Sequence, residues 1–271
     1  YQIQNLHFSL ADFQYIFWWE WAHRFLGRVI GFAFAIPFVI FLFQRRFSWR
    51  LATPLAVLFV LGGLQGALGW WMVSSGLSVR VDVSQYRLAA HLSAAALLFV
   101  ALVFVARRLE DQPRSTTVAP MWPAVTLLIL ILIQIAAGAF VAGLDAGMSY
   151  NTWPLMDGKL VPDGLTAQSP WYLNFFENVT TVQFDHRVTA YALVVLALAH
   201  LVTLIRSADD ERIVGSAGVL AACVLAQMLI GIWTLLWGVP LELGLAHQAG
   251  AAVVIAAATL HLHTITRAAA P

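Results

Sequence analysis

Seven apolar runs follow one another along this chain of 271 residues. A transmembrane helix needs about 20 consecutive apolar residues, and the runs cover residues 21–43, 53–73, 86–106, 122–144, 183–205, 213–239 and 243–266. Charged residues make up only 11% of the chain, whereas a soluble domain has about 25%. The sequence therefore predicts an all-α polytopic membrane protein and excludes an ordinary soluble enzyme.

Charge and cysteine content exclude two further classes of protein. The net charge is +1, so there is no basic surface of the kind that nucleic acid requires. The single cysteine, Cys223, cannot form an internal disulfide. It also excludes an iron–sulfur cluster, which needs about four cysteine ligands.

The arginines predict how the spans are oriented. Connections that follow the first, third, fifth and seventh runs are rich in arginine, whereas the opposite connections hold only Arg80 and Lys159. By the positive-inside rule, these four runs cross from outside to inside. The membrane would be a bacterial plasma membrane or a mitochondrial inner membrane. The inner arginines are Arg45, Arg46, Arg50, Arg107, Arg108, Arg114, Arg206, Arg212 and Arg267.

The chain contains an internal repeat. Both copies keep the same orientation, which predicts two halves, 1–115 and 116–271, related by a pseudo-twofold axis along the membrane normal. Three stretches recur at spacings of 163, 162 and 156 residues: EWAHR (20–24) with QFDHR (183–187), QGALGW (65–70) with QMLIGIW (227–233), and His91 with His247.

The repeat also predicts a helix that this chain lacks. The run 122–144 opens the second half, and its counterpart would precede residue 1. We therefore expect eight helices in all, arranged as two four-helix units, a type of unit that builds cofactor sites between facing helices. Residues 1–19 would be the tail of an outer loop that matches residues 145–177. The loop 145–178 is either an interfacial aromatic segment or a lid over an outer site.

Four histidines lie at matched places of the repeat, near the outer ends of spans: His23, His91, His186 and His247. Two facing histidines without Cys, Asp or Glu beside them suit the two axial positions of a haem iron. We expect His23 to pair with His91 and His186 with His247, giving one haem site per half. Pairing across the halves is the alternative.

Other polar residues near the spans have two interpretations. Haem propionates are anionic, and an arginine at the outer membrane boundary can bind them. Snorkelling to the lipid headgroups is the alternative for the same arginines. The candidates are Arg24, Arg28, Arg87 and Arg187, while His200, His261 and His263 are expected to be interfacial residues at the inner side.

The two halves differ three residues before the first histidine, where Glu20 corresponds to Gln183. A spacing of three residues places Glu20 on the same helical face as His23. An ionisable acid beside one haem predicts that the reaction takes place at the first site. The second site would then transfer electrons. In the alternative interpretation, Glu20 only pairs with Arg24.

These motifs resemble those of the haem A synthase family over essentially the whole chain. The stretches concerned are residues 20–24 with Gly27 and Arg28, residues 134–138 leading to AGLDAG (142–147), YNTWPLMDG (150–158), FDHR (184–187) and AHQ (246–248).

The resemblance implies an oxidoreductase that hydroxylates a ring methyl of haem O twice to give haem A. It implies haem O at His23 and His91, a haem B cofactor at His186 and His247, and Glu20 as the catalytic glutamate. Implied partners are membrane lipid, haem O synthase, cytochrome oxidase assembly factors and an electron partner, and a homo-oligomer is left open. A dihaem b-type cytochrome that only transfers electrons and a haem carrier are the competing functions.

Overall fold

The computed structural model describes residues 9–76, 82–110 and 119–268. Within these residues the chain is helical, and the only extended pairing is one isolated bridge between Met156 and Lys159. In the described parts of the chain, seven helices are long and apolar enough to cross a membrane. They confirm the predicted spans, and the protein is an all-α integral membrane protein. The seven are α1 (Leu10–Phe43), α2 (Trp49–Ser74), α3 (Gln85–Arg108), α4 (Trp122–Gly143), α6 (Val179–Ser207), α7 (Glu211–Leu236) and α8 (Leu241–Ala268).

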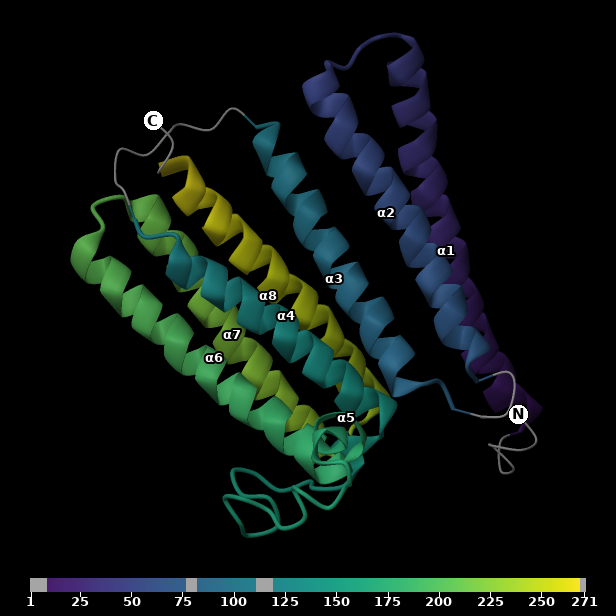
Figure 1. Ribbon diagram of the computed structural model, residues 1–271, viewed down its shortest axis with the longest axis vertical. Coiled ribbons are helices and arrows are strands. Elements are labelled where there is room, and N and C mark those ends of the chain that lie inside the picture. Colours follow the sequence, from purple (N-terminus) through teal and green to yellow (C-terminus); the bar gives the residue numbers. More distant parts are fainter. Residues whose placement is uncertain (1–8, 77–81, 111–118, 269–271) are drawn as a thin grey trace. The chain divides into compact units, whose positions relative to one another are not determined.

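Two compact units make up the chain, Tyr1–Arg87 and Leu88–Pro271. In the first unit α1 and α2 form a hairpin (Figure 1). Aromatic rings join its two helices, since Phe59 of α2 stacks on Phe34 of α1 at a centroid distance of 6.2 Å. Stacked aromatic pairs add about 0.5–1.5 kcal/mol beyond the area that they bury.

The first helix begins earlier than the sequence analysis predicted. Ser9 and Asp12 form a capping box in which Ser9 Oγ accepts from the Asp12 amide and the Asp12 carboxylate accepts from the Ser9 amide, at 2.9 Å. Such a box satisfies two amides that a helix start leaves without partners. The predicted outer loop over residues 1–19 is therefore wrong from Leu10 onward. Residues 1–8, and also Arg80 and Arg114 of the charge analysis, lie outside the described residues.

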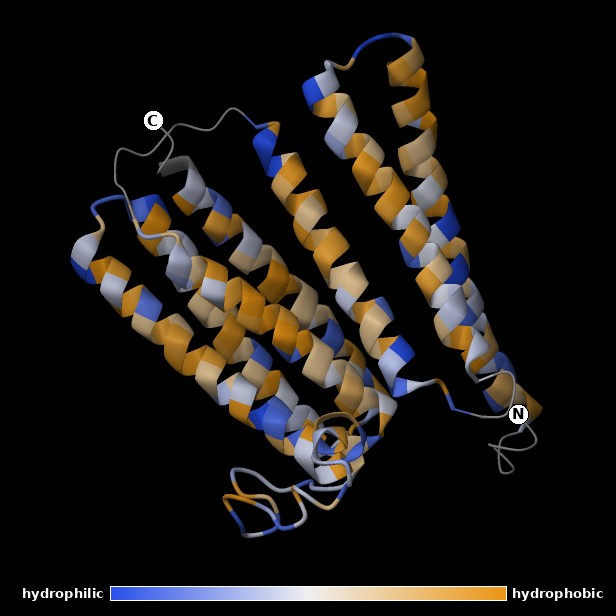
Figure 2. Ribbon diagram, viewed as in Figure 1, coloured by the Kyte–Doolittle hydropathy of each residue, from blue (hydrophilic) through white to orange (hydrophobic). Residues whose placement is uncertain are grey.

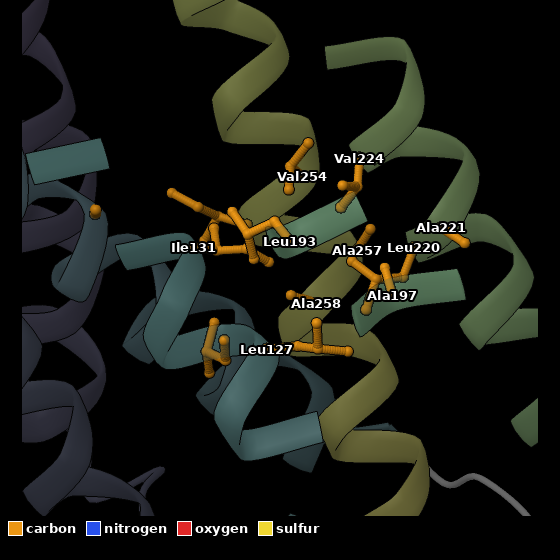
Figure 3. Packing of buried hydrophobic residues seen from close by; sticks show 13 residues of the cluster. Leu127, Ile131, Leu193, Ala197, Leu220, Ala221, Val224, Val254, Ala257 and Ala258 are labelled. Atoms are coloured by element: carbon orange, nitrogen blue, oxygen red, sulfur yellow. The ribbon is translucent and has the colours of Figure 1, made fainter. Parts of the chain in front are cut away.

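The second unit contains a closed four-helix bundle. Helix α4 packs on α6, α6 on α7, α7 on α8, and α8 again on α4. Figure 3 shows the buried side chains that all four helices contribute to the bundle interior. Many are small, which lets helices approach closely where lipid removes the hydrophobic driving force between them. The buried alanines include Ala197, Ala221, Ala257 and Ala258.

The two ends of this bundle differ in composition. One end carries the α6–α7 connection and the start of α4, and the other carries α5 (Asn174–Glu177) with the long α4–α6 loop (Figure 1). Figure 2 shows hydrophilic residues concentrated at both ends and in the loop, with apolar residues between them. This distribution is typical of helices that cross a hydrocarbon layer.

The expectation that His200, His261 and His263 are interfacial is wrong. All three are buried, and His261 has no exposed surface. Their helices turn these side chains into the bundle, where His200 Nε2 lies 2.8 Å from His261 Nε2 and His261 Nδ1 lies 2.8 Å from Ser216 Oγ. Because Ser216 donates its proton to the Ile213 carbonyl, it must accept from His261 Nδ1–H. His261 Nε2 then accepts from His200 Nε2–H.

The direction of this chain of hydrogen bonds gives a first prediction. His200→Leu removes the donor to His261 and leaves a buried ring nitrogen without a partner. We expect a loss of roughly 1–2 kcal/mol in the free energy of unfolding, measured by thermal unfolding in detergent. Combining it with His261→Leu should cost clearly less than the sum of the single variants. Additive costs would contradict the hydrogen bond between the two rings.

Candidate functional site

His186 of α6 and His247 of α8 face each other inside the bundle. Their ring centroids are 6.5 Å apart, and the ring planes are inclined at 79°. Two imidazoles that bind one metal ion from opposite sides, each with a nitrogen about 2 Å from it, have centroids about 6 Å apart. The structure thus brings together the two histidines that the repeat paired in the second half, at a separation that one metal ion bridges.

A glutamine and a glycine from α4 hold the His186 ring. Gln134 Nε2 donates to the His186 carbonyl at 2.9 Å and lies 3.1 Å from His186 Nδ1. One helical turn further on is Gly138, where an added Cβ would lie 3.1 Å from His186 Cε1. The amide therefore anchors the backbone of His186, and the absent side chain of Gly138 leaves room for the ring.

The His247 ring has the same surroundings on α7. Gln227 Nε2 donates to the His247 carbonyl at 2.7 Å and lies 3.1 Å from His247 Nδ1. A Cβ at Gly231, four residues later, would lie 2.7 Å from His247 Cε1. We call each glutamine with its following glycine a Gln-Gly cradle. The same spacing occurs at Gln65 and Gly69 of α2, and this recurrence was the signal by which the sequence could have revealed the cradles.

The cradles predict a graded effect of adding one methyl group. Gly231→Ala places a carbon in hard contact with the His247 ring, so we expect the ring to shift and haem retention to fall about 10-fold or more. Gly138→Ala, with its looser contact, should have a smaller effect. Gly218→Ala is the matched control on α7, because its Cβ would meet only Leu201 at 4.0 Å. Haem content per purified protein measures all three, and equal losses would contradict the prediction.

The α4–α6 loop is bound to one face of α6. Arg187 donates to the carbonyls of Tyr150 and Thr152 at 2.7 and 2.9 Å, and Gln183 donates to the same Tyr150 carbonyl at 3.1 Å. Trp153 donates to the Tyr191 hydroxyl at 3.0 Å. Residues spaced by four share a helix face, so the loop runs directly beside the face adjoining His186.

Further bonds fix both ends of this loop. Asn151 donates to the Gly147 and Leu235 carbonyls, each at 2.9 Å, and so connects the loop to the end of α7. Asn178 caps α6 by accepting from the Thr180 amide at 3.0 Å. These contacts hold both ends of the loop on the bundle, and the lid and the interfacial interpretations both stay predictions.

The first unit contains the candidate acid. Glu20 forms an ion pair with Arg24 at 2.7 Å, four residues along α1. Glu20 and His23 belong to this unit, while His91 lies in α3 of the second unit. The pairing of His23 with His91 stays a prediction from the repeat.

The candidate arginines have different surroundings. Arg87 donates to the Trp71 carbonyl at 2.8 Å and lies over the Trp71 ring at 4.6 Å. Arg24 is paired with Glu20, and Arg187 is bound to the loop. Three of the four predicted propionate partners thus already bind polar groups of the protein. The Nε of Arg187 is nevertheless buried and has no partner within the described part of the chain, so this guanidinium retains donor capacity.

The donors around His186 and His247 fit a haem iron. Among the described residues, no three or more His, Cys, Asp or Glu gather into a group that could hold a metal ion. An opposed pair of imidazoles is the ligand set of a six-coordinate haem, in which the porphyrin supplies the other four nitrogens. The glycine-lined rings and their separation therefore agree with the haem interpretation.

Comparison with known proteins is consistent with this geometry. A family described as cytochrome oxidase assembly protein matches residues 1–259. The chain belongs to this family. It is also 51% identical to the protein named Heme A synthase from Parvibaculum lavamentivorans over 98% of this chain and 77% of that protein. The resemblance found in the sequence is confirmed.

Two further relatives are similar over nearly the whole chain. The Heme A synthase of Allorhizobium ampelinum is 51% identical over 97% of this chain and 72% of its own length. That of Bradyrhizobium diazoefficiens is 49% identical over 96% and 73%. The similarity therefore includes both units and all seven spanning helices.

Proposed function

We propose that this protein is a haem A synthase, an oxidoreductase that converts haem O into haem A. The observation that carries this proposal is the identity of about half of all residues with proteins named Heme A synthase, over nearly the full chain. The facing His186 and His247 support it, because an enzyme of this kind must hold haem within the membrane.

The proposed reaction oxidises a methyl group on the porphyrin ring of haem O. A first hydroxylation with oxygen from water gives an alcohol and a second gives a geminal diol; each releases two electrons to the electron partner and two protons. The diol loses water to form the formyl group of haem A. Both hydroxylations remove hydrogen from the same carbon. A residue that takes up or delivers protons beside that carbon is therefore useful in both steps.

His186 and His247 would hold haem B at the site in the second half. Bound there, haem B supplies one-electron transfer. The residues of the chain orient the two imidazoles, since each cradle fixes one histidine between an amide and a glycine. The loop bound to Gln183 and Arg187 excludes water from the outer side of this site.

The site in the first half holds haem O, with His23 and His91 as ligands. The support is the repeat, which places these histidines in correspondence with His186 and His247. Glu20 replaces the neutral Gln183 at the corresponding position, and its carboxylate holds or transfers the proton. Glu20 forms an ion pair with Arg24, and a carboxylate at this position can act as a base.

Charge and orientation complete the proposal. Arg24, Arg28, Arg87 and Arg187 bind haem propionates at the outer membrane boundary. By the positive-inside rule, helices α1, α3, α6 and α8 would run from outside to inside, and both haem sites would then lie toward the outer side. Lipid, haem O synthase, oxidase assembly factors and an electron partner are the proposed partners.

The test is to identify the haems in cells that express the protein together with a supply of haem O. Chromatography and mass spectrometry of the extracted haems should reveal haem A or its hydroxylated precursor. Haem B and unchanged haem O in a haem-loaded protein would favour the dihaem cytochrome. Haem O that exchanges rapidly and is never oxidised would favour the carrier.

A further inference from the structure

We propose that an apolar groove between α1 and α2 binds the isoprenoid tail of haem O, the long hydrocarbon chain that distinguishes this haem from haem B. The groove has a volume of about 450 Å³, a size typical of small-molecule pockets. This inference rests on the proposed function, because it assigns a site to one part of the proposed substrate.

The walls of the groove are largely apolar. Phe38 lines it from α1, and Val57 and Leu61 line it from α2. Of the lining residues, Thr53 alone has a hydroxyl group, and its Oγ1 donates to the Trp49 carbonyl at 2.9 Å. Because this hydroxyl is bound to the backbone of its own helix, the groove suits a hydrocarbon ligand and offers little to a polar one.

The groove follows the stripe of α2 that carries the third Gln-Gly spacing. Leu61 and Val57 precede Gln65 by four and eight residues, so the three lie on adjoining turns of one helix face. In the second half, the corresponding Gln227 contacts the proposed ligand His247. By the repeat, the groove begins one helical turn from a residue that corresponds to a contact of the haem site.

The direction of the groove agrees with the chemistry of haem O. The propionates would lie at the outer membrane boundary, and the tail is attached at the opposite edge of the porphyrin, so it points toward the middle of the membrane. Phe38 lies fifteen residues beyond His23 on α1, which is about 22 Å along the helix axis. A tail that starts at the inner edge of the porphyrin extends toward this level.

The corresponding place in the second half is closed by direct packing of helices. Phe38 and Ala56 line the groove, and their counterparts in the repeat are Leu201 and Gly218. A Cβ at Gly218 would already be in van der Waals contact with Leu201 Cδ1, at 4.0 Å. Small residues let membrane helices approach closely. The half proposed for haem B is thus filled at this place, and haem B has no isoprenoid tail.

Binding of the tail fixes the orientation of the porphyrin. Two axial histidines alone allow a haem to bind with either face toward a given ligand, and the two orientations place different ring methyls near Glu20. A tail held in the groove selects one of them. The groove therefore determines which methyl carbon is positioned for oxidation.

The test fills the groove and compares the tail-bearing haems, which are haem O and its oxidation products, with haem B. Ala56→Leu adds a branched side chain inside the groove. Ala33→Leu is the matched control, because Ala33 is exposed on α1 and does not line the groove. The full chain is purified from cells that supply both haems, and the extracted haems are counted by chromatography. We expect the tail-bearing haem per haem B to fall about 5-fold or more in Ala56→Leu, since overpacking an apolar site is costly. The ratio should stay unchanged in Ala33→Leu.

A second variant keeps the test decisive should Ala56→Leu fail to fold. Val60→Trp narrows the groove from a lining position that is 59% exposed, and it should lower the ratio in the same direction. Retained haem B shows that a variant is folded with its second site intact. An unchanged ratio in both variants would overturn the inference. In that case, loss of copurified phospholipid or a changed oligomeric state would identify a lipid chain or a second copy as the occupant.

The unchanged protein distinguishes failure of this inference from failure of the proposed function. Absence of every tail-bearing haem from the unchanged protein would refute the proposed function itself. Haem A formed at the ordinary ratio in Ala56→Leu and Val60→Trp would refute only the groove.

Discussion

Replacing Glu20 by Gln is expected to abolish the conversion of haem O while both haems stay bound. The substitution keeps the size and polarity of the side chain and removes its ability to exchange a proton. Positioned acids and bases contribute about 10²- to 10⁴-fold to rate, and two successive hydroxylations would each lose that contribution. The variant also copies the second half, where Gln183 stands at the corresponding position.

The measurement is the ratio of haem A to haem O in extracts from cells that express the variant or the unchanged protein. Glu242→Gln is a suitable control, since it removes a carboxylate from the first turn of α8, five residues before a proposed ligand. It should leave the ratio unchanged. Normal turnover in Glu20→Gln would reject the assignment of Glu20. The interpretation of Glu20 as a mere partner of Arg24 would then stand.

Replacing His186 or His247 by Ala is expected to remove haem B. Each variant deletes one of two opposed ligands, so the loss should exceed the roughly 10- to 100-fold cost of altering groups that only support a ligand. The reduced-minus-oxidised spectrum of the purified protein and the amount of extracted haem B report the loss. Haem O should remain bound at the first site in both variants.

A buried histidine on the same helix provides the matched control. His200 lies fourteen residues beyond His186 on α6 and bonds to His261. His200→Ala should lower stability and leave the haem B spectrum intact. If His186→Ala instead lost haem O and kept haem B, the assignment of one haem to each half would be wrong.

The spans were predictable because membrane crossing depends on the length of an apolar run, which can be read locally. The start of α1 was not, because it depends on the capping box between Ser9 and Asp12 in a stretch of mixed polarity. A serine followed three residues later by an acidic residue is the signal that was overlooked.

The inner histidines show a different limit of sequence reasoning. Polar residues near the end of a span are commonly interfacial, and only the packing of α6, α7 and α8 reveals that His200 and His261 point inward. Their spacing was nevertheless informative. His200 and His261 each lie fourteen residues after a proposed ligand, which is two heptads on the same helical stripe.

Only part of the candidate site could be predicted from the sequence, for a related reason. The repeat pointed to His186 and His247, but the contacts of Gln134 and Gln227 cross from one helix to another. Such contacts depend on the rotation of each helix about its axis. The sequence shows that the glutamines recur, but it does not show which histidine ring each of them contacts.

An imidazole confined between an amide and a bare glycine backbone can adopt few rotamers. Immobilising a flexible side chain at a binding site costs about 0.5–1.5 kcal/mol. For His186 and His247 this entropy is lost when α4, α6, α7 and α8 assemble, because the Gln-Gly cradles restrict both rings. The conformational entropy of the two rings is therefore lost on folding and not on haem binding. The protein can capture a rigid, planar tetrapyrrole without ordering its ligands at the moment of encounter.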